Sequence, residues 1–167
     1  MKWLWLLRHA HARGGSPDAA RPLSERGRRE AEGAAEALAA AAPGPTVALC
    51  SPALRARATA DPIRRALGEG FEIRVDDALY LAAPGTILAR LTALEDTVEA
   101  VVVVAHNPGL GDLVQAGARG GSAVARAALS GGFPPAALAG FRADVDRWSE
   151  LDPALLRLVS ATLQART

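Results

Sequence analysis

Two continuous apolar runs limit what this chain of 167 residues can fold into. Residues 3–7 are large and apolar and end at charge, and residues 101–104 are four consecutive valines. Strands without polar alternation are typical of parallel sheets whose two faces are both covered by helices. Valine also favours strands. The two runs therefore predict an α/β fold, a three-layer α/β/α sandwich around a mostly parallel central sheet.

Shorter apolar patterns predict the rest of the sheet. Strands are expected at residues 46–50, 71–75 and 137–143, the second of them at an edge of the sheet. After Trp148 two alternatives stay open. Asp152-Pro153 is typical of a helix start, whereas Leu156 and Leu158 alternate as they would in a strand.

Helices are expected between the strands. Ser24 is the expected N-cap of the first helix. Ser51, followed by a proline, predicts a second helix that begins at Ala53. Pro62 lies inside this second helix and is expected to kink it or to restart it with Asp61 as a new cap. Two further helices are expected after Thr86 and around Leu110.

Composition limits the partners and the location of the protein. The net charge is +1 and 50% of the residues are hydrophobic, as in an ordinary globular chain, so we expect no nucleic-acid partner. The length fits one domain over residues 1–167. Cys50 is the only cysteine, which excludes an internal disulfide and suits a reducing compartment. The N-terminal apolar run is too short for a signal peptide or a membrane span, so we expect a cytoplasmic protein.

Histidine or arginine side chains, with polar neighbours, follow three of the predicted strands. Arg8 and His9 come after the first strand, residues 51–55 (SPALR) after the second, and His106 and Asn107 after the valine strand. Because ligands of open α/β sheets bind at the carboxyl ends of the strands, these side chains are expected to meet. Two imidazoles and two guanidinium groups at helix N-termini would form a positive pocket for a tetrahedral anion such as phosphate.

Each of these signals also has a purely structural interpretation. His9 could be a strand-end histidine that bonds a backbone carbonyl, Arg55 could lie on a solvated helix face, and His106-Asn107 could only cap a helix. The combination at three equivalent strand ends favours the anion pocket.

Four segments, in this order, resemble the motifs of the histidine phosphatase superfamily. They are residues 7–10 (LRHA), 21–27 (RPLSERG), 51–59 (SPALRARAT) and 104–108 (VAHNP). The RHA form, the RPL-S-x-x-G block and the short length are most similar to the SixA-like phosphohistidine phosphatase branch, and the match runs from Met1 to about Val114. The resemblance implies a phosphoglycerate mutase-like fold and a phosphatase that needs no cofactor.

The resemblance also implies a role for each matching residue. His9 would be the nucleophile that forms a covalent phosphohistidine, and Arg8, Arg55 and His106 would bind the equatorial phosphoryl oxygens. His106 is expected to act as a cation or as a hydrogen-bond donor. Three further residues are expected at the periphery of the phosphate pocket, namely Arg21, Ser51 and Asn107.

Histidine-phosphorylated protein is the substrate that the resemblance favours. Two alternatives remain: a small phosphorylated metabolite handled by the same chemistry, and a phosphate-binding module that has lost turnover. A metal site is a weaker alternative, because His9-x-His11 presents two imidazoles on one strand face. The chain has one more histidine and no carboxylate beside this pair, so no metal is expected.

The leaving-group side is where the resemblance is weakest. Many members of the superfamily carry a Glu or Asp in the connection that corresponds to residues 76–84, and the nearest candidates here are Asp76 and Asp77. Asp77 is the candidate general acid, and the alternative is a loop or capping residue. A missing acid matters for an alkoxide leaving group and much less for the imidazole of phosphohistidine.

Overall fold

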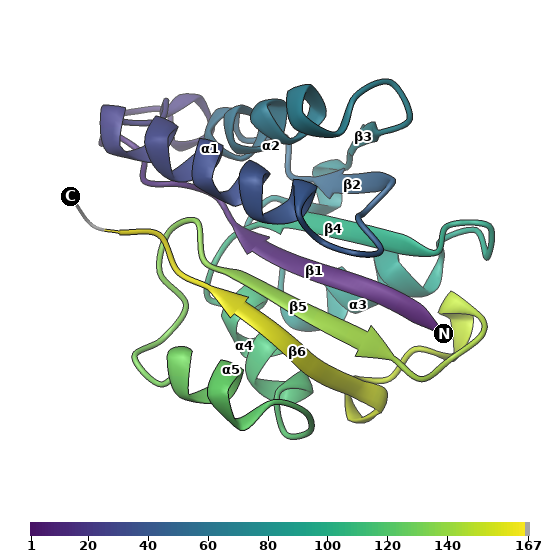
Figure 1. The fold of residues 1–167 in the computed structure, drawn as a ribbon. Helices are drawn as coiled ribbons and strands as arrows, with labels where there is room; N and C mark the ends of the chain where they lie inside the picture. The colour runs from purple at the N-terminus through teal and green to yellow at the C-terminus, as the bar shows by residue number, and fades with distance from the viewer. Residues whose placement is uncertain (166–167) are drawn as a thin grey trace.

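A six-stranded mixed sheet forms the centre of the computed structural model, which describes residues 1–165 (Figure 1). The strand order is β3-β2-β4-β1-β5-β6. The strands are β1 (Lys2–Arg8), β2 (Val47–Cys50), β3 (Glu72–Val75), β4 (Ala100–Ala105), β5 (Leu138–Ala143) and β6 (Leu156–Thr162). The pairs β1–β4, β2–β4 and β2–β3 are parallel, and β5 is antiparallel to both of its neighbours. The α/β prediction and the edge position of β3 are confirmed.

Helices cover both faces of this sheet, which explains why its two central strands lack polar alternation (Figure 1). One face carries α1 (Glu25–Ala39) and α2 (Leu54–Leu67), packed on Trp5 and Leu7 of β1. The other face carries α3 (Pro84–Thr92), α4 (Gly109–Gly117) and the short α5 (Ala123–Ala128). Leu4 and Leu6 of β1 face this second layer, and both are fully buried.

The helix starts follow the sequence signals in part. Ser24 caps α1 as predicted, with its hydroxyl accepting from the Gly27 N–H at 3.0 Å. The second helix begins at Leu54, one residue later than predicted, and Ser51 is not its N-cap. The prediction that Pro62 restarts the helix is wrong, because α2 is unbroken through that position. Burial of Pro62 against the core offsets the hydrogen bond that proline cannot make.

The end of the chain combines both alternatives left open by the sequence. Asp152 caps a 3-10 turn, η4 (Pro153–Leu155), by accepting from the Ala154 N–H at 2.8 Å, and β6 follows at once. Three other 3-10 turns are η1 (Asp18–Ala20), η2 (Asp77–Leu79) and η3 (Trp148–Glu150). Within residues 1–165, no helix is both long enough and apolar enough to cross a membrane.

Candidate active site

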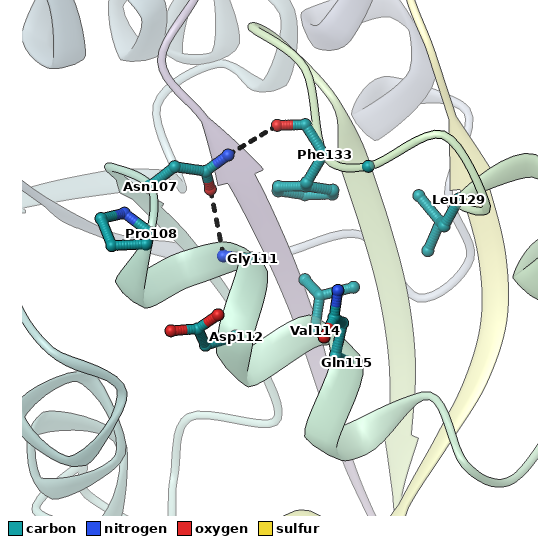
Figure 2. Close-up of a pocket in the computed structure, with 9 residues that line it drawn as sticks. Asn107, Pro108, Gly111, Asp112, Val114, Gln115, Leu129 and Phe133 are labelled. Atoms are coloured by element: carbon teal, nitrogen blue, oxygen red, sulfur yellow. Dashed lines mark hydrogen bonds between the residues drawn. The ribbon is translucent and has the colours of Figure 1, made fainter.

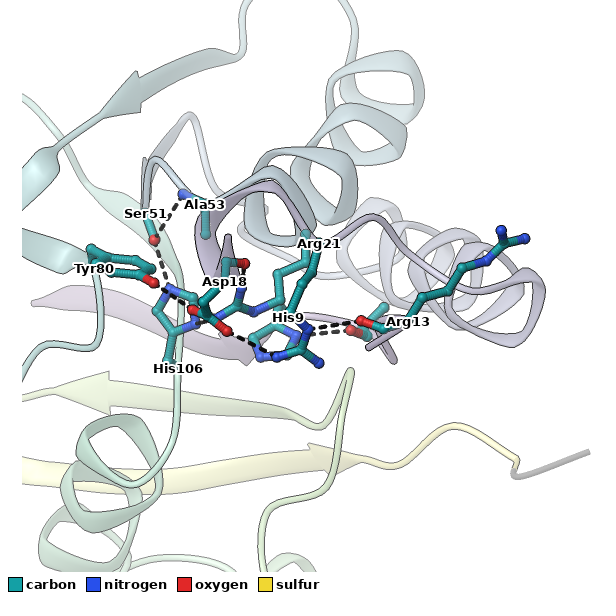
Figure 3. A network of polar contacts seen from close by, with 10 residues as sticks. His9, Arg13, Asp18, Arg21, Ser51, Ala53, Tyr80 and His106 are labelled. Carbon is teal, nitrogen blue, oxygen red and sulfur yellow. Dashed lines mark hydrogen bonds and ion pairs between the residues drawn. The ribbon is translucent and has the colours of Figure 1, made fainter. Parts of the chain in front are cut away.

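The carboxyl ends of β1, β2 and β4 meet at one edge of the sheet, and the side chains that follow them lie together (Figure 3). The rings of His9 and His106 are 5.2 Å apart between centroids. Arg55, in the first turn of α2, brings its Nη2 to 3.4 Å from His106 Nδ1. The three segments that follow the predicted strands therefore form one cluster.

One ring nitrogen of His9 is hydrogen-bonded to the backbone, and the other is left with a lone pair. Its Nδ1 lies 2.8 Å from the carbonyl oxygen of Ala10, which can only accept, so Nδ1 carries the hydrogen and Nε2 keeps a lone pair. Burial lowers the pKa of His9 to about 4, and the charges of Arg55 and Arg8 act in the same direction. His9 is therefore neutral at physiological pH, with Nε2 able to attack an electrophile.

His106 is also neutral, so of its two expected roles, cation or hydrogen-bond donor, only the donor role remains. Burial and the neighbouring His9 and Arg55 lower the pKa of His106 to about 3. Because the Arg55 guanidinium can only donate, His106 Nδ1 accepts from it and Nε2–H donates to Ser51 Oγ at 2.7 Å. A hydroxyl can also donate, so Ser51 allows the other tautomer, in which Nδ1–H would point at an anion.

The two arginines carry buried donors that face no protein acceptor. Arg55 is only 3% exposed, and Nε of both Arg55 and Arg8 is buried without a hydrogen-bond partner within residues 1–165. The Nη1 atom of Arg8 donates to the carbonyl oxygen of Phe133 at 3.2 Å. Buried guanidinium donors without partners cost free energy, and an oxyanion can satisfy them. Together with the two neutral imidazoles, these donors make an arrangement that could bind a tetrahedral oxyanion, and the cluster is called the oxyanion site below.

Thr59 fixes the His9 segment to α2, a role that sequence reasoning missed. Its buried hydroxyl accepts from the Ala10 N–H at 2.9 Å and donates to the Arg55 carbonyl at 2.7 Å. The position of Thr59, four residues after an arginine on a helix, is the one detectable sequence signal, because a threonine there can bond back to the preceding turn. One hydroxyl thus couples the backbones next to His9 and Arg55.

Thr59→Val is expected to lower the free energy of unfolding by about 1–3 kcal/mol, because it leaves the buried Ala10 N–H unpaired at nearly constant volume. Urea unfolding of the variant measures this loss. Thr92→Val is the matched control, since the Thr92 hydroxyl bonds back along α3 to the Ala89 carbonyl in an exposed hydrogen bond. An equal loss in both variants would contradict a special role for Thr59.

The predicted peripheral residues divide into two groups. Arg21 lies at the rim, where Nη1 donates to Asp18 Oδ1 at 3.0 Å and its charge contributes to lowering the pKa of His9. Asn107, which precedes α4, instead accepts from the Gly111 N–H in the first turn of that helix at 3.1 Å and donates to the Phe133 carbonyl at 2.8 Å. It lines a different pocket, of about 210 Å³, between α4 and the segment around Phe133 (Figure 2).

The connection before α3 presents a tyrosine to the site in place of a carboxylic acid. Asp76 caps η2 and pairs with Arg90 at 3.1 Å. Asp77 is exposed, and within the described chain its carboxylate makes no hydrogen bond or ion pair with the site. Tyr80 lies edge-on against the His106 ring at 5.6 Å, and its hydroxyl donates to Asp18. This arrangement gives no support to Asp77 as a general acid.

Asp18 is the second residue that sequence reasoning missed. Its carboxylate accepts from Tyr80, Arg21 and Arg55 (Figure 3). These three hydrogen bonds, of which that from Tyr80 contributes most, hold the pKa of Asp18 well below its usual range. Asp18 lies in a loop rich in Gly, Ser and Pro, where no pattern marks it, and only contacts with distant residues reveal it.

His11 points away from the oxyanion site. The ring nitrogen Nδ1 of His11 bonds to Ser24 Oγ at 2.7 Å, and the backbone N–H of His11 donates to Glu30 Oε1 at 2.9 Å. Within residues 1–165, no group of three or more His, Cys, Asp or Glu side chains is arranged around a common metal position. The backbone of His11 also explains the glycine of the RPLSERG segment, because a Cβ on Gly27 would collide with the His11 carbonyl oxygen.

The two neutral histidines should make stability depend on pH. In the unfolded chain a histidine binds a proton below about pH 6.5, whereas folded His9 and His106 stay neutral down to pH values near 4 and 3. Their contribution to stability is therefore complete above about pH 6.5 and is lost as the pH falls toward 4. We expect the pair to cost roughly 3 kcal/mol or more between pH 7 and about pH 4.5.

Urea unfolding at the two pH values measures this cost, with His9→Asn/His106→Asn as the comparison. An unchanged pH dependence in the double variant would contradict the assignment.

Comparison with sequences of known proteins agrees with this geometry. The profile of the histidine phosphatase superfamily (branch 1) matches residues 4–86. The chain is 34% identical over 155 residues to the uncharacterized protein Rv1276c of Mycobacterium tuberculosis (strain H37Rv), and the alignment covers 89% of this chain and 95% of that protein.

Two solved structures share the fold. One, assigned as the phosphohistidine phosphatase SixA from Agrobacterium tumefaciens, has a TM-score of 0.80 and 31% identity over 98% of each chain. The other, the protein histidine phosphatase SixA complexed with tungstate, has a TM-score of 0.71 and 27% identity over 85% of this chain and 88% of that chain. The chain is therefore a phosphatase of the histidine phosphatase superfamily and belongs to its SixA-like branch.

Proposed function

We propose that this phosphatase removes the phosphoryl group from phosphohistidine in a protein, through a covalent phosphohistidine on its own His9. The likeness to two SixA structures, which carry the names of phosphohistidine phosphatases, supports the substrate class. The observation that carries the proposal is the absence of a protonated carboxyl group among the described side chains at the site, where Asp18 is held ionised.

The first step transfers the phosphoryl group to His9. The lone pair of Nε2 attacks phosphorus in line with the bond to the substrate imidazole, and that P–N bond breaks as the new one forms. The substrate ring carries a proton on its other nitrogen and therefore leaves as neutral imidazole. Arg8 and Arg55 donate to the equatorial oxygens, whose negative charge must be held through the transition state. His106 joins them when its hydrogen moves to Nδ1, the tautomer that the Ser51 hydroxyl permits.

The second step returns His9 to its neutral form. A water oxygen attacks phosphorus, the bond to Nε2 breaks, and inorganic phosphate leaves with the protons of the water. The Ala10 carbonyl keeps the hydrogen on Nδ1 throughout, so Nε2 is again the atom with the lone pair. No metal or cofactor takes part in this scheme.

The leaving group decides the substrate class. An alkoxide must be protonated as it leaves, and neither acidic group next to the site is suited to this. Asp18 has given up its proton, and its hydrogen bond to Tyr80 raises the pKa of the tyrosine. A phosphohistidine releases an imidazole, whose pKa near 6.5 makes it a far weaker base than an alkoxide. The chemistry of the site therefore fits a phosphoramidate.

Competing substrates test the proposal. A histidine-containing signalling domain, phosphorylated with radioactive phosphate, and a sugar phosphate are offered to the enzyme at equal concentration. We expect kcat/KM to be at least about tenfold higher for the protein, because only its leaving group departs without an acid. A preference for the sugar phosphate would indicate a small-molecule phosphomonoesterase. Failure to hydrolyse either substrate would indicate a phosphate-binding module.

A further inference from the structure

Arg55 is held at one end by a single residue. Its Nη1 donates to the backbone carbonyl of Asp18 at 2.8 Å, and its Nη2 donates to Oδ2 of the same residue at 3.1 Å. Both terminal nitrogens of the guanidinium are therefore engaged by Asp18, in the two-pronged arrangement that fixes a planar group most strongly.

The opposite edge of the same guanidinium faces the site. Arg55 Nε is buried and has no hydrogen-bond partner within the described residues, and Nη2 also lies 3.4 Å from His106 Nδ1. The Nε–H therefore remains for a phosphoryl oxygen, and the Nη2–H beside it is released when the hydrogen of His106 moves to Nδ1. Asp18 and a phosphoryl group can thus occupy different edges of one guanidinium.

The Asp18 carboxylate is itself fixed from two sides. Tyr80 donates to Oδ2 while its ring packs edge-on against His106, and Arg21 donates to Oδ1 at 3.0 Å. The two partners come from different segments, the connection before α3 and the loop before α1. The orientation of Arg55 therefore depends on a network that joins three parts of the chain.

We propose that Asp18 is a positioning residue of the phosphatase reaction, which holds the terminal nitrogens of Arg55 so that its Nε/Nη2 edge faces the phosphoryl group. Tyr80 supports this function through Asp18. The proposal rests on the phosphatase activity and is independent of phosphohistidine as the substrate. An anchored arginine costs less entropy at the transition state than one that must be ordered there.

A double-mutant cycle tests whether Asp18 acts through Arg55. The activity is measured with an aryl phosphate, whose leaving group needs no acid, and the affinity for orthovanadate is measured by calorimetry. Asp18→Ala is expected to lower kcat about 10- to 100-fold with little change in KM. A misoriented Arg55 guanidinium destabilises the transition state more than it weakens the binding of substrate. In an Arg55→Ala background the same substitution should change kcat and vanadate affinity by less than about twofold.

Conservative variants separate positioning from folding. Both variants keep the backbone carbonyl that accepts from Arg55 Nη1, but only Asp18→Asn keeps a side-chain oxygen acceptor for Nη2, so it should recover most of the activity that Asp18→Ala loses. Tyr80→Phe removes the hydroxyl and keeps the ring against His106, and it should lower kcat about threefold in the wild type and not at all beside Asp18→Ala. Glu32→Ala, which removes the carboxylate from an exposed ion pair with Arg65, is the control and should leave kcat unchanged.

Two results would overturn the proposal. Equal losses from Asp18→Ala in the presence and absence of Arg55 would mean that Asp18 acts independently of it. Tighter vanadate binding by Asp18→Ala would mean that the carboxylate competes with the phosphoryl group for Arg55. Urea unfolding of Asp18→Ala is measured alongside, so a loss of folding is not counted as a loss of positioning. Vanadate affinity reports the coupling without any turnover, so a wrong substrate class would leave this test intact.

Discussion

His9→Ala is expected to lower kcat by about 10⁵-fold or more, the loss typical of removing a nucleophile from a covalent mechanism. The physical reason is that no other described side chain at the site offers a lone pair in the same place. The two ring nitrogens of His106 are engaged by Arg55 and by Ser51. Phosphate release from an aryl phosphate measures the loss.

Acid-labile labelling by radioactive phosphate identifies the intermediate directly. The wild type should incorporate label and His9→Ala should not. His11→Ala is the matched control, because His11 lies two residues away and bonds to Ser24 outside the oxyanion site. The control should label normally and keep its turnover within about threefold. Label retained in His9→Ala would assign the nucleophile to another residue.

Arg55→Ala is expected to lower kcat by about 10²- to 10³-fold, the usual cost of removing a donor to a transition-state oxyanion. The effect on KM should be smaller, because the transferred phosphoryl group gathers charge on its equatorial oxygens only as the reaction proceeds. Steady-state kinetics with one substrate gives both constants.

Arg57→Ala provides the comparison for Arg55. Arg57 lies on the same helix two residues later, but it is exposed and makes no contact with the site. Its loss should change neither constant by more than about twofold. If Arg55→Ala raised KM and left kcat unchanged, Arg55 would be a residue for binding alone.

The sequence predicted those parts of the site whose signals are local. Strand ends carry the signal for His9 and His106, since an apolar run that stops at a polar residue is visible in a single sequence. The parallel order of β1, β2 and β4 then brings the strand ends to one edge, as the topology of α/β sheets requires. Fold class and cluster were therefore both within reach of sequence reasoning.

Residues whose roles depend on distant contacts were beyond sequence reasoning. Asp18 and Tyr80 are 62 positions apart, and neither belongs to a periodic pattern. For Ser51 only the N-cap prediction is wrong: Ser-Pro is a helix-start signal, whereas the hydroxyl bonds to His106, 55 positions later in the chain, in the site where Ser51 is expected at the periphery. Asp77 was chosen for its residue type and its place in a connection, and the turn at η2 directs it to solvent. The N-cap prediction for Ser51 is overridden by a long-range contact, whereas the Asp77 prediction fails because residue type alone does not fix where a turn directs a side chain.

The carbonyl oxygen of Phe133 accepts both from Arg8 and from Asn107. These hydrogen bonds join the segment before β5 to the ends of β1 and β4. In the same segment, the backbone N–H of Ala136 donates to the carbonyl oxygens of Arg8 and His9. For protein engineering, this divides the segment into two parts. Substitutions of the exposed residues of α5 would alter the outer surface, whereas an insertion between Phe133 and Ala136 would displace the backbone of Arg8 and His9.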